Sequence, residues 1–425
     1  MEKKIMNEVE ALSDELVELC RELVRTNTVN PYSGDPNFGS EAAGQRILKP
    51  VLENMGARVR LFEPPEGIYS KMGVLGPKER DFKGRPNLVA EFDFGRPGKR
   101  IIINGHMDTV AASGMSIDPF SAEVKDGLIW GRGTSDCKGG LSSGLIAVKA
   151  LLPFADELSG SIVYESVVDE ECNGSGAGTL ACCYEGYRGD AAIVVDGNDL
   201  EITTGCGGCL TADLKVFGRM GHAARSDGVS AIEKALIIKR GIDAFKKERE
   251  RLRPSAKVNL GVFRSGVHPA VVPGEAYMSL NIVYELDEAE KARREGRGWG
   301  GKEIMEDFEK AVRGAEKADS WFEMHPVEIE WVKDLIPFQT PEDGELVREL
   351  TRACKDVLGT TPTVRSIPAW ADAAYLYHFA ETPTVLFGPG IGKLCHAPDE
   401  NVTIENLVNS AKVIALYLYR QLSAA

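Results

Sequence analysis

The sequence predicts an α/β fold, in which a mostly parallel sheet flanked by helices is interrupted by a smaller inserted α+β domain. Up to about residue 204, short apolar runs typical of strands alternate with amphipathic helical patterns, and the same alternation returns after residue 335. Between those points, strands with a two-residue alternation belong to two strand-helix-strand units. We therefore expect one domain from residues 1–204 and 336–425, and an inserted domain from residues 205–335.

Apolar periodicity predicts the individual elements. The expected strands are Leu88–Phe92, Arg100–Ile103, Ser161–Val168, Ala191–Val195, Leu210–Phe217, Tyr277–Tyr284, Val327–Val332 and Thr384–Phe387. The expected helices are one with an apolar stripe from Val9 to Leu23, then Gly140–Leu152, Ser230–Lys247, Ile304–Ala315, Gly344–Leu358 and Ile404–Leu422. Residues 63–86 are rich in Pro and Gly, which predicts a long surface loop. Residues 285–303 are highly charged, which predicts a segment that projects into solvent.

Composition excludes several classes of protein. A length of 425 residues exceeds what one compact core normally holds, which predicts two or three domains. With 64 Asp+Glu against 50 Lys+Arg, the net charge of -14 argues against a nucleic-acid or anionic-membrane partner. We expect no membrane span, because no run of about 18 apolar residues occurs. Nine scattered cysteines and an acidic start without a signal peptide predict a cytoplasmic protein with free thiols.

Polar residues of the kinds that bind metals follow the ends of the predicted strands. In open α/β sheets the functional crevice lies at the carboxyl ends of the strands, so these side chains should converge. Histidines with carboxylates suit a catalytic zinc or similar ion, and the surplus of ligands suits two ions that share one carboxylate. One further acid would then handle protons. The set comprises His106, Asp108, Asp136, Asp169, Glu170, Glu171, Asp196 and His396.

Each motif also has an ordinary interpretation. A lone His-x-Asp is usually a surface or capping pair, and an Asp-Glu-Glu run is usually a solvated turn. The turn GRGTSDCKGG resembles a phosphate loop but lacks the G-x4-G-K-[ST] spacing, which disfavours nucleotide binding. A nucleophilic pair of Cys137 and His106 leaves the acidic residues unexplained. The occurrence of all these motifs in order at strand ends favours the metal site.

The motifs together resemble those of the dinuclear zinc deacylase and exopeptidase family, which includes acetylornithine deacetylase, succinyl-diaminopimelate desuccinylase, aminoacylase and glutamate carboxypeptidase. Matching motifs run over nearly the whole chain, in the order GHMDTV, GRGTSDCKGG, DEE, VVDG, GRMGHAARSDGVSAI and CHAPDENV. The resemblance implies a zinc-exopeptidase-like catalytic domain and an inserted ferredoxin-like domain through which two copies form a homodimer.

The resemblance also implies the ligands of two divalent ions, with zinc expected and cobalt or manganese as alternatives. His106 and Asp196 would bind one ion, Glu171 and His396 the other, and Asp136 would bridge both.

Three further residues would act without binding metal. Glu170 would be the general base for a metal-activated bridging water, and Asp108 would orient His106 by a hydrogen bond. His222 would reach into the active site of the other subunit and stabilise the oxyanion of the reaction intermediate.

Two segments depart from the family pattern. In HPAVVPGEAYMSLNIVY, Ala270 stands where Asn is usual and Val283 stands roughly where Arg is usual. In PAWADAAYL, Asp372 is kept, whereas Trp370 replaces a small residue and Ala374 replaces an expected Arg. The loss of two guanidinium groups disfavours a substrate with a free α-carboxylate.

The same departures suggest a different binding surface. Trp370 favours a flat or aromatic leaving amine stacked on its ring. Arg264, Arg365 and His268 are either a relocated anion site or ordinary surface residues.

These residues predict a metal-dependent hydrolase that cleaves a linear amide C–N bond of a small N-acyl compound. The alternatives are a dipeptidase or carboxypeptidase, an N-formyl aminomethylpyrimidine deformylase and, in a different class, a non-catalytic metal-binding scaffold. A scaffold has no need of Glu170, an acid that would bind no metal. The acyl group, the amine and the metal in the cell stay open.

Overall fold

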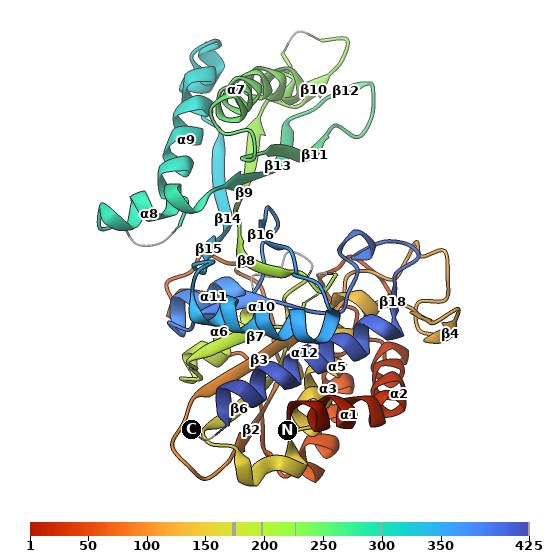
Figure 1. Cartoon of the computed structure of the whole chain (residues 1–425). Helices are drawn as coiled ribbons and strands as arrows, with labels where there is room; N and C mark the ends of the chain where they lie inside the picture. Colours follow the sequence, from red (N-terminus) through yellow and green to blue (C-terminus); the bar gives the residue numbers. More distant parts are fainter. Residues whose placement is uncertain (172–175, 197–198, 226, 298–299, 424–425) are drawn as a thin grey trace.

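The computed structural model describes residues 1–171, 176–196, 199–225, 227–297 and 300–423. Figure 1 shows a larger part that contains both chain ends and a smaller part that projects from it. The predicted fold class, an α/β domain with a largely parallel central sheet and an inserted α+β domain, is confirmed. The domain limits expected at 204/205 and 335/336 stay a prediction; strand β8 (Ile202–Cys206) ends and β15 (Phe338–Gln339) begins close to them.

Within the described residues, the larger part is built on a nine-stranded sheet. Strand β3 pairs in parallel with β6 on one side and β7 on the other, and β17 extends this parallel centre beyond β7. The path through the sheet is β1 (Arg58–Phe62), β2 (Asn87–Asp93), β6 (Ser161–Val167), β3 (Arg100–His106), β7 (Ala191–Val194), β17 (Thr384–Leu386), β8 and β15, with β16 (Val364–Ile367) paired to β8. A small sheet joins β4 (Glu123–Lys125), β5 (Leu128–Trp130) and β18 (Asn401–Thr403).

Helices cover both faces of this sheet, because its central strands are apolar on both sides. Ile101 and Ile103 of β3 pack into one core with the helices α1 (Glu2–Ala11), α2 (Ser13–Arg25), α3 (Glu41–Asn54), α5 (Gly139–Lys149), α10 (Glu345–Leu358) and α12 (Ile404–Leu422). Ile102 points the other way, into a second core with α4 (Ile68–Lys71), α6 (Ala177–Tyr184) and α11 (Ala373–Phe379). The short turns Thr134–Lys138, Leu152–Glu157, Ser320–Glu323 and Gly392–Leu394 complete the described helical elements.

The inserted part is a four-stranded antiparallel sheet with helices on one face (Figure 1). Its order is β11 (Val258–Ser265), β13 (Glu275–Tyr284), β9 (Gly208–Phe217) and β14 (Glu328–Leu335). Alternate residues such as Leu210 and Leu280 pack on α7 (Ala231–Leu252) and α9 (Lys302–Glu316), while α8 (Leu286–Arg294) precedes α9. The residues between them, such as Thr211 and Asn281, are polar and face away from the helices. The two-residue period therefore leaves one polar sheet face open.

Three local predictions were incomplete. The stripe from Val9 to Leu23 spans two helices that break at Leu12, because α1 packs on α12 while α2 packs on α5. Residues 63–86 are not only a surface loop, since they contain α4 and bury Tyr69 and Phe82 in the second core. Residues 285–303 contain α8, which is begun by a reciprocal capping box between Glu285 and Glu288.

No helix in the described ranges has the length and apolar character that a membrane crossing requires. The cytoplasmic location stays a prediction.

Candidate metal centre

The ends of three parallel strands bring the predicted ligands together. His106 is the last residue of β3 and lies beside Val167, the last residue of β6. The acidic run Asp169-Glu170-Glu171 follows β6, and Asp196 follows β7. Because these strands are parallel neighbours, their carboxyl ends meet at one edge of the sheet, as expected from the sequence.

The carboxylate of Asp136 lies between two histidines. Its Oδ1 is 2.8 Å from His106 Nε2, and its Oδ2 is 3.4 Å from His396 Nε2. His396 Nε2 is also 3.0 Å from Glu171 Oε2. Each oxygen of one carboxylate therefore faces a different histidine, which is the arrangement expected of a ligand shared by two ions.

The donor atoms form two overlapping sets, each of which could hold a metal ion. One set of donors within 4.8 Å of one another comprises His106, Asp136 and Glu171, and another comprises His106, Cys137 and Asp196. Imidazole nitrogens and carboxylate oxygens are suitable ligands for zinc and similar ions. His106 Nδ1 lies 2.9 Å from the Asp108 carbonyl, which can only accept, so the neutral ring keeps its Nε2 lone pair for a metal.

Cys137 is held as a structural thiol. Its Sγ accepts the main-chain N–H of His106 at 3.1 Å and is fully buried. Burial raises the pKa of the Cys137 thiol to about 12, so a thiolate nucleophile is disfavoured at this position.

Asp108 contacts His106 through its main chain, and its carboxylate positions the acidic run instead. The Asp108 carboxylate is 3.7 Å from His106 Nδ1, beyond hydrogen-bond distance. It accepts the main-chain N–H groups of Glu170 at 3.2 Å and Glu171 at 3.1 Å. The side-chain amide of Asn30 donates to the same carboxylate at 2.8 Å, a contact across 78 residues that sequence reasoning missed.

A second missed residue, Glu400, holds the turn that carries Asp136. Its Oε1 accepts the main-chain N–H groups of Gly133 at 3.1 Å, Ser135 at 2.9 Å and Asp136 at 3.2 Å. Its Oε2 accepts from Arg132 at 2.7 Å. The only available signal was the place of Glu400 within the motif CHAPDENV.

The acids around the centre have strongly shifted proton affinities. Burial raises the pKa of Glu170 well above its ordinary value, and the neighbouring carboxylates of Asp372 and Glu171 act in the same direction. Burial and the charge of Asp136 raise the pKa of Glu171 to about 7. Hydrogen bonds to Asp136 and Glu171 raise the pKa of His396 to about 11. A cluster of buried acids of this kind is typical of a site that holds cations or transfers protons.

Two predicted histidines lie in the inserted part, outside this cluster. His222 is exposed on the short strand β10 (Gly221–His222), which pairs with β12 (Val271–Val272), and its Nδ1 accepts the N–H of Ala224 at 3.1 Å. His268 is likewise exposed and accepts the N–H of Ala270 at 3.1 Å.

The predicted substrate residues separate into buried and exposed groups. Trp370 is half-buried, and its indole N–H donates to the carbonyl of Ile336 at 3.1 Å. Asp372 is buried and accepts the hydroxyl of Thr179 at 2.6 Å. Arg365 is exposed and pairs with Glu201 at 2.6 Å.

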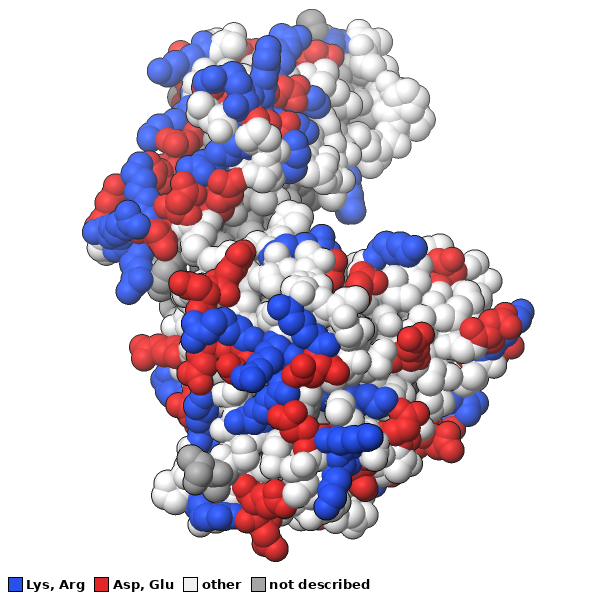
Figure 2. Space-filling view, in the orientation of Figure 1, with Lys and Arg blue, Asp and Glu red and all other residues white. Residues whose placement is uncertain are grey.

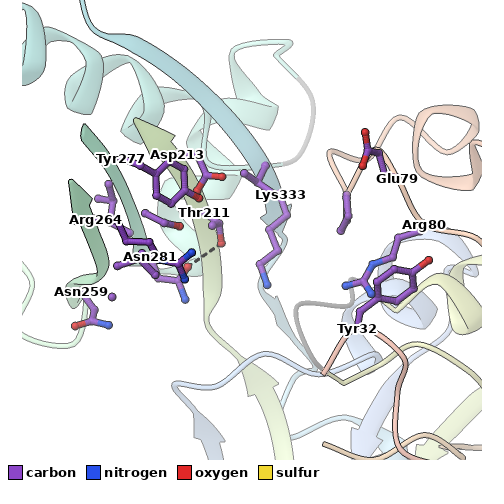
Figure 3. A pocket seen from close by; sticks show the side chains of 16 residues that line it. Tyr32, Glu79, Arg80, Thr211, Asp213, Asn259, Arg264, Tyr277, Asn281 and Lys333 are labelled. Carbon is purple, nitrogen blue, oxygen red and sulfur yellow. Dashed lines mark hydrogen bonds between the residues drawn. The ribbon is translucent and has the colours of Figure 1, made fainter. Parts of the chain in front are cut away.

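Arg264 lines a cleft between the two parts of the molecule, with a volume of about 660 Å³. One wall is the polar face of the inserted sheet, with Thr211, Asn281 and Arg264 (Figure 3). Tyr32 and Arg80 of the larger part form the opposite wall, and Lys333 extends between the walls.

Comparison with known proteins decides the family. The model of peptidase family M20/M25/M40 matches residues 102–420. This chain belongs to that family.

Individual relatives agree with this assignment. The chain is 28% identical to an N-formyl-4-amino-5-aminomethyl-2-methylpyrimidine deformylase from Halalkalibacterium halodurans, over 98% of this chain and 96% of that one. The fold matches a dipeptidase from Saccharomyces cerevisiae with a TM-score of 0.73 and 16% identity, over 98% of both chains. It also matches a dinuclear metal-binding M20 peptidase from Bacillus subtilis with a TM-score of 0.66 and 16% identity, over 97% of this chain and 99% of that one.

Membership of this family confirms the predicted resemblance and the prediction of a hydrolase of the class that acts on amide bonds. A metal-dependent reaction at a dinuclear centre follows at the level of the family.

Proposed function

We propose that this M20-family chain is a deacylase that hydrolyses the amide bond of a small N-acyl compound. The observation that carries the proposal is the carboxylate of Asp136, whose two oxygens face His106 and His396 separately. In this proposal His106 and Asp196 hold one ion, Glu171 and His396 hold the other, and Asp136 touches both. Two bound divalent ions supply a water of lowered pKa and a polarised amide carbonyl.

Glu170 carries the proton in the proposed reaction. Its main-chain N–H donates to the carboxylate of Asp108, and its side chain is close enough to His106, Glu171 and Asp196 for their charges to act on its pKa. A carboxylate with a raised pKa can take a proton from the attacking water and release it to the leaving nitrogen. Asp108 and Asn30 act as positioning residues, because they fix the main chain that presents Glu170 and Glu171.

We also propose that the active enzyme is a homodimer formed through the inserted domain. His222 is exposed on β10 of the inserted part, and in this proposal a second copy of the chain brings it to the metal centre. Large apolar side chains are exposed near it, including Met220 at 70% and Val267 at 94%. Figure 2 shows a face free of Lys, Arg, Asp and Glu on the side of the inserted part that carries β10 and β12.

A second candidate function is deformylation of an aminomethylpyrimidine. It is favoured by the relative of that name, which aligns with this chain over almost its full length. Ala374 adds support, because it is fully buried in α11 and offers no guanidinium group at the position where the family often has Arg. In this second proposed function, the half-buried ring of Trp370 lies beside the leaving amine.

One experiment tests the metal-dependent deacylase and separates the candidates. The purified chain is loaded with zinc, cobalt or manganese and assayed against N-formyl, N-acetyl and N-succinyl compounds, dipeptides and N-formyl aminomethylpyrimidine. We expect hydrolysis of one N-acyl class that a chelator abolishes and the metal restores. Activity that survives complete metal removal but is lost on thiol alkylation would refute the proposal.

A further inference from the structure

Asp169 belongs to the acidic run after β6, and the proposed reaction gives it no role. Within the described residues, neither of the two metal-donor sets includes it. Its side chain is fully buried, and both of its oxygens accept hydrogen bonds from the larger part of the molecule. Oδ1 accepts from Arg85 at 3.1 Å, and Oδ2 accepts the hydroxyl of Tyr69 at 3.2 Å. The task of this carboxylate therefore differs from that of its two neighbours in the run.

The main chain at Asp169 has a left-handed conformation, with φ at 66°. Residues other than glycine adopt this region uncommonly, Asp and Asn tolerate it best, and such positions gather at functional sites. The N–H groups of Glu170 and Glu171, which follow directly, both reach the carboxylate of Asp108, at 3.2 and 3.1 Å. In an extended strand, consecutive residues face opposite sides. A left-handed residue turns the chain so that consecutive N–H groups converge on one anion, an arrangement called a nest.

Segments far away in the chain hold this turn. The buried guanidinium group of Arg85 donates to Asp169 and also to both oxygens of Glu41, at 3.0 and 3.1 Å. The side-chain amide of Asn30 donates to Asp169 at 3.3 Å and to Asp108 at 2.8 Å. One amide thus links the residue that turns the chain to the carboxylate that receives the two N–H groups. A buried ion pair is costly to break, because the remaining charge is left uncompensated.

We propose that Asp169 is a positioning residue that sets the direction of Glu170. It does so by fixing the left-handed turn from which the Glu170 side chain leaves the main chain. This inference rests on the proposed deacylase function and deepens it by adding a residue that acts through the main chain. A carboxylate that transfers a proton must lie within hydrogen-bond distance of the water it deprotonates, and a displacement of about 1 Å can cost about 10²-fold in rate.

Substitutions at position 169 separate the main-chain conformation from the side-chain contacts. Asp169→Asn keeps the shape of the side chain and its tolerance of the left-handed region, but it loses the charge. Asp169→Gly allows the conformation and loses every contact, whereas Asp169→Ala loses both. Asp126→Ala is the matched control, because Asp126 is also a left-handed aspartate, with φ at 53°, in the exposed turn between β4 and β5.

Hydrogen exchange of the metal-free protein reports the turn without any reaction. Mass spectrometry with fragmentation to single amides follows the N–H groups of Glu170 and Glu171, which donate to Asp108. We expect exchange at both amides to be about 10-fold faster or more in Asp169→Ala, since a hydrogen bond of ordinary strength is lost. Asp169→Asn should stay within about threefold of wild type, and Asp126→Ala should match it. Wild-type exchange in Asp169→Ala would overturn the proposal.

Turnover tests the consequence for catalysis, at saturating metal, with the N-formyl, N-acetyl or N-succinyl compound that the wild type hydrolyses. We expect kcat to fall by about 10²-fold in Asp169→Ala and by at most about threefold in Asp169→Asn, with KM nearly unchanged. Asp169→Gly should lie between them, and it replaces the alanine variant if that variant does not fold. Asp126→Ala should keep the wild-type kcat.

The outcome separates a positioning role from a structural one. If Asp169 served only stability, the variants would unfold at lower urea concentration while the folded enzyme kept the wild-type kcat, and that result would overturn the proposal. If the wild type hydrolysed none of these compounds, the deacylase function would fail. The exchange rates at Glu170 and Glu171 would still decide whether Asp169 fixes the turn.

Discussion

Glu400 accepts the main-chain N–H of Asp136 at 3.2 Å, across 264 residues of sequence. The same oxygen accepts two further N–H groups of the turn that presents Asp136, so one carboxylate determines the position of the proposed bridging ligand. We expect Glu400→Ala to weaken metal binding by about 10- to 100-fold, since residues that orient ligands typically contribute that much. Competition with a chromogenic chelator measures the affinity. The exposed Glu405→Ala is the control, and equal affinities in the two variants would contradict the role of Glu400.

The proposed sharing of Asp136 predicts different metal contents for two similar substitutions. Asp136→Asn should lose both ions, because each of its oxygens faces a different histidine. Asp196→Asn should lose only the ion that it shares with His106. Elemental analysis after dialysis counts the ions per chain, with the exposed Asp126→Asn as the reference. Retention of one ion by Asp136→Asn would show that this carboxylate does not bridge.

Glu170 is expected to act on protons without holding metal. Glu170→Ala should keep the wild-type metal content and lower kcat by about 10²- to 10⁴-fold or more. Turnover and elemental analysis on the same preparation separate the two effects, and the exposed Glu66→Ala controls for the loss of a carboxylate. A variant that turns over at the wild-type rate would exclude Glu170 as the general base.

The exposed position of His222 predicts complementation between subunits. In a mixture of His222→Ala and Glu170→Ala chains, a mixed dimer would contain one site with both residues intact. Random exchange in equal amounts should therefore restore about one quarter of the wild-type activity, given a two-fold dimer. Native mass spectrometry verifies that mixed dimers form. If they form and remain inactive, each site is complete within one chain.

A buried acid away from the metal ligands predicts a pH dependence of stability. Burial raises the pKa of Glu165 to about 7, and its carboxylate accepts from Asn104 at 2.9 Å. In the unfolded chain a glutamate titrates near 4.3, so the folded state binds more protons between those values and loses stability as the pH rises through that window. Glu165→Gln should remove this loss, which amounts to at most about 4 kcal/mol.

Urea unfolding of the metal-free chain at pH 4.5 and pH 7.5 measures the effect as a difference in the free energy of unfolding. Glu66→Gln, at an exposed site, should follow wild type. An identical pH dependence in Glu165→Gln and wild type would mean that Glu165 is ionised in the folded protein at neutral pH.

Much of the metal centre was predictable because its ligands lie at strand ends. His106, Asp196 and the acidic run after β6 each follow an apolar strand whose period and length are local properties. The residues that hold them were not predictable in the same way. Asn30 and Glu400 act through single contacts to segments far away in the chain, and nothing in their immediate neighbours indicates such partners.

The incomplete predictions have the same physical cause, because contacts with distant segments determine these parts of the structure. Local charge density suggested a solvated excursion at residues 285–303, yet a capping box and two buried alanines start and anchor α8 against α9. The orientation of Lys333 depends on one extra residue in the pairing of β14 with β9, and that register is decided by the neighbouring strand.

By itself, the sequence determined the alternation of strands and helices, the presence of an inserted domain and the chemical types of the metal ligands. These depend on periodicity and on short motifs, which neighbouring residues carry. Only the tertiary structure decided that Asp136 faces two histidines, that Asp108 holds the main chain of the acidic run, and that Lys333 and Arg80 enter one cleft. Those relationships are distances between segments remote in sequence, and packing of the whole chain is what brings them within contact.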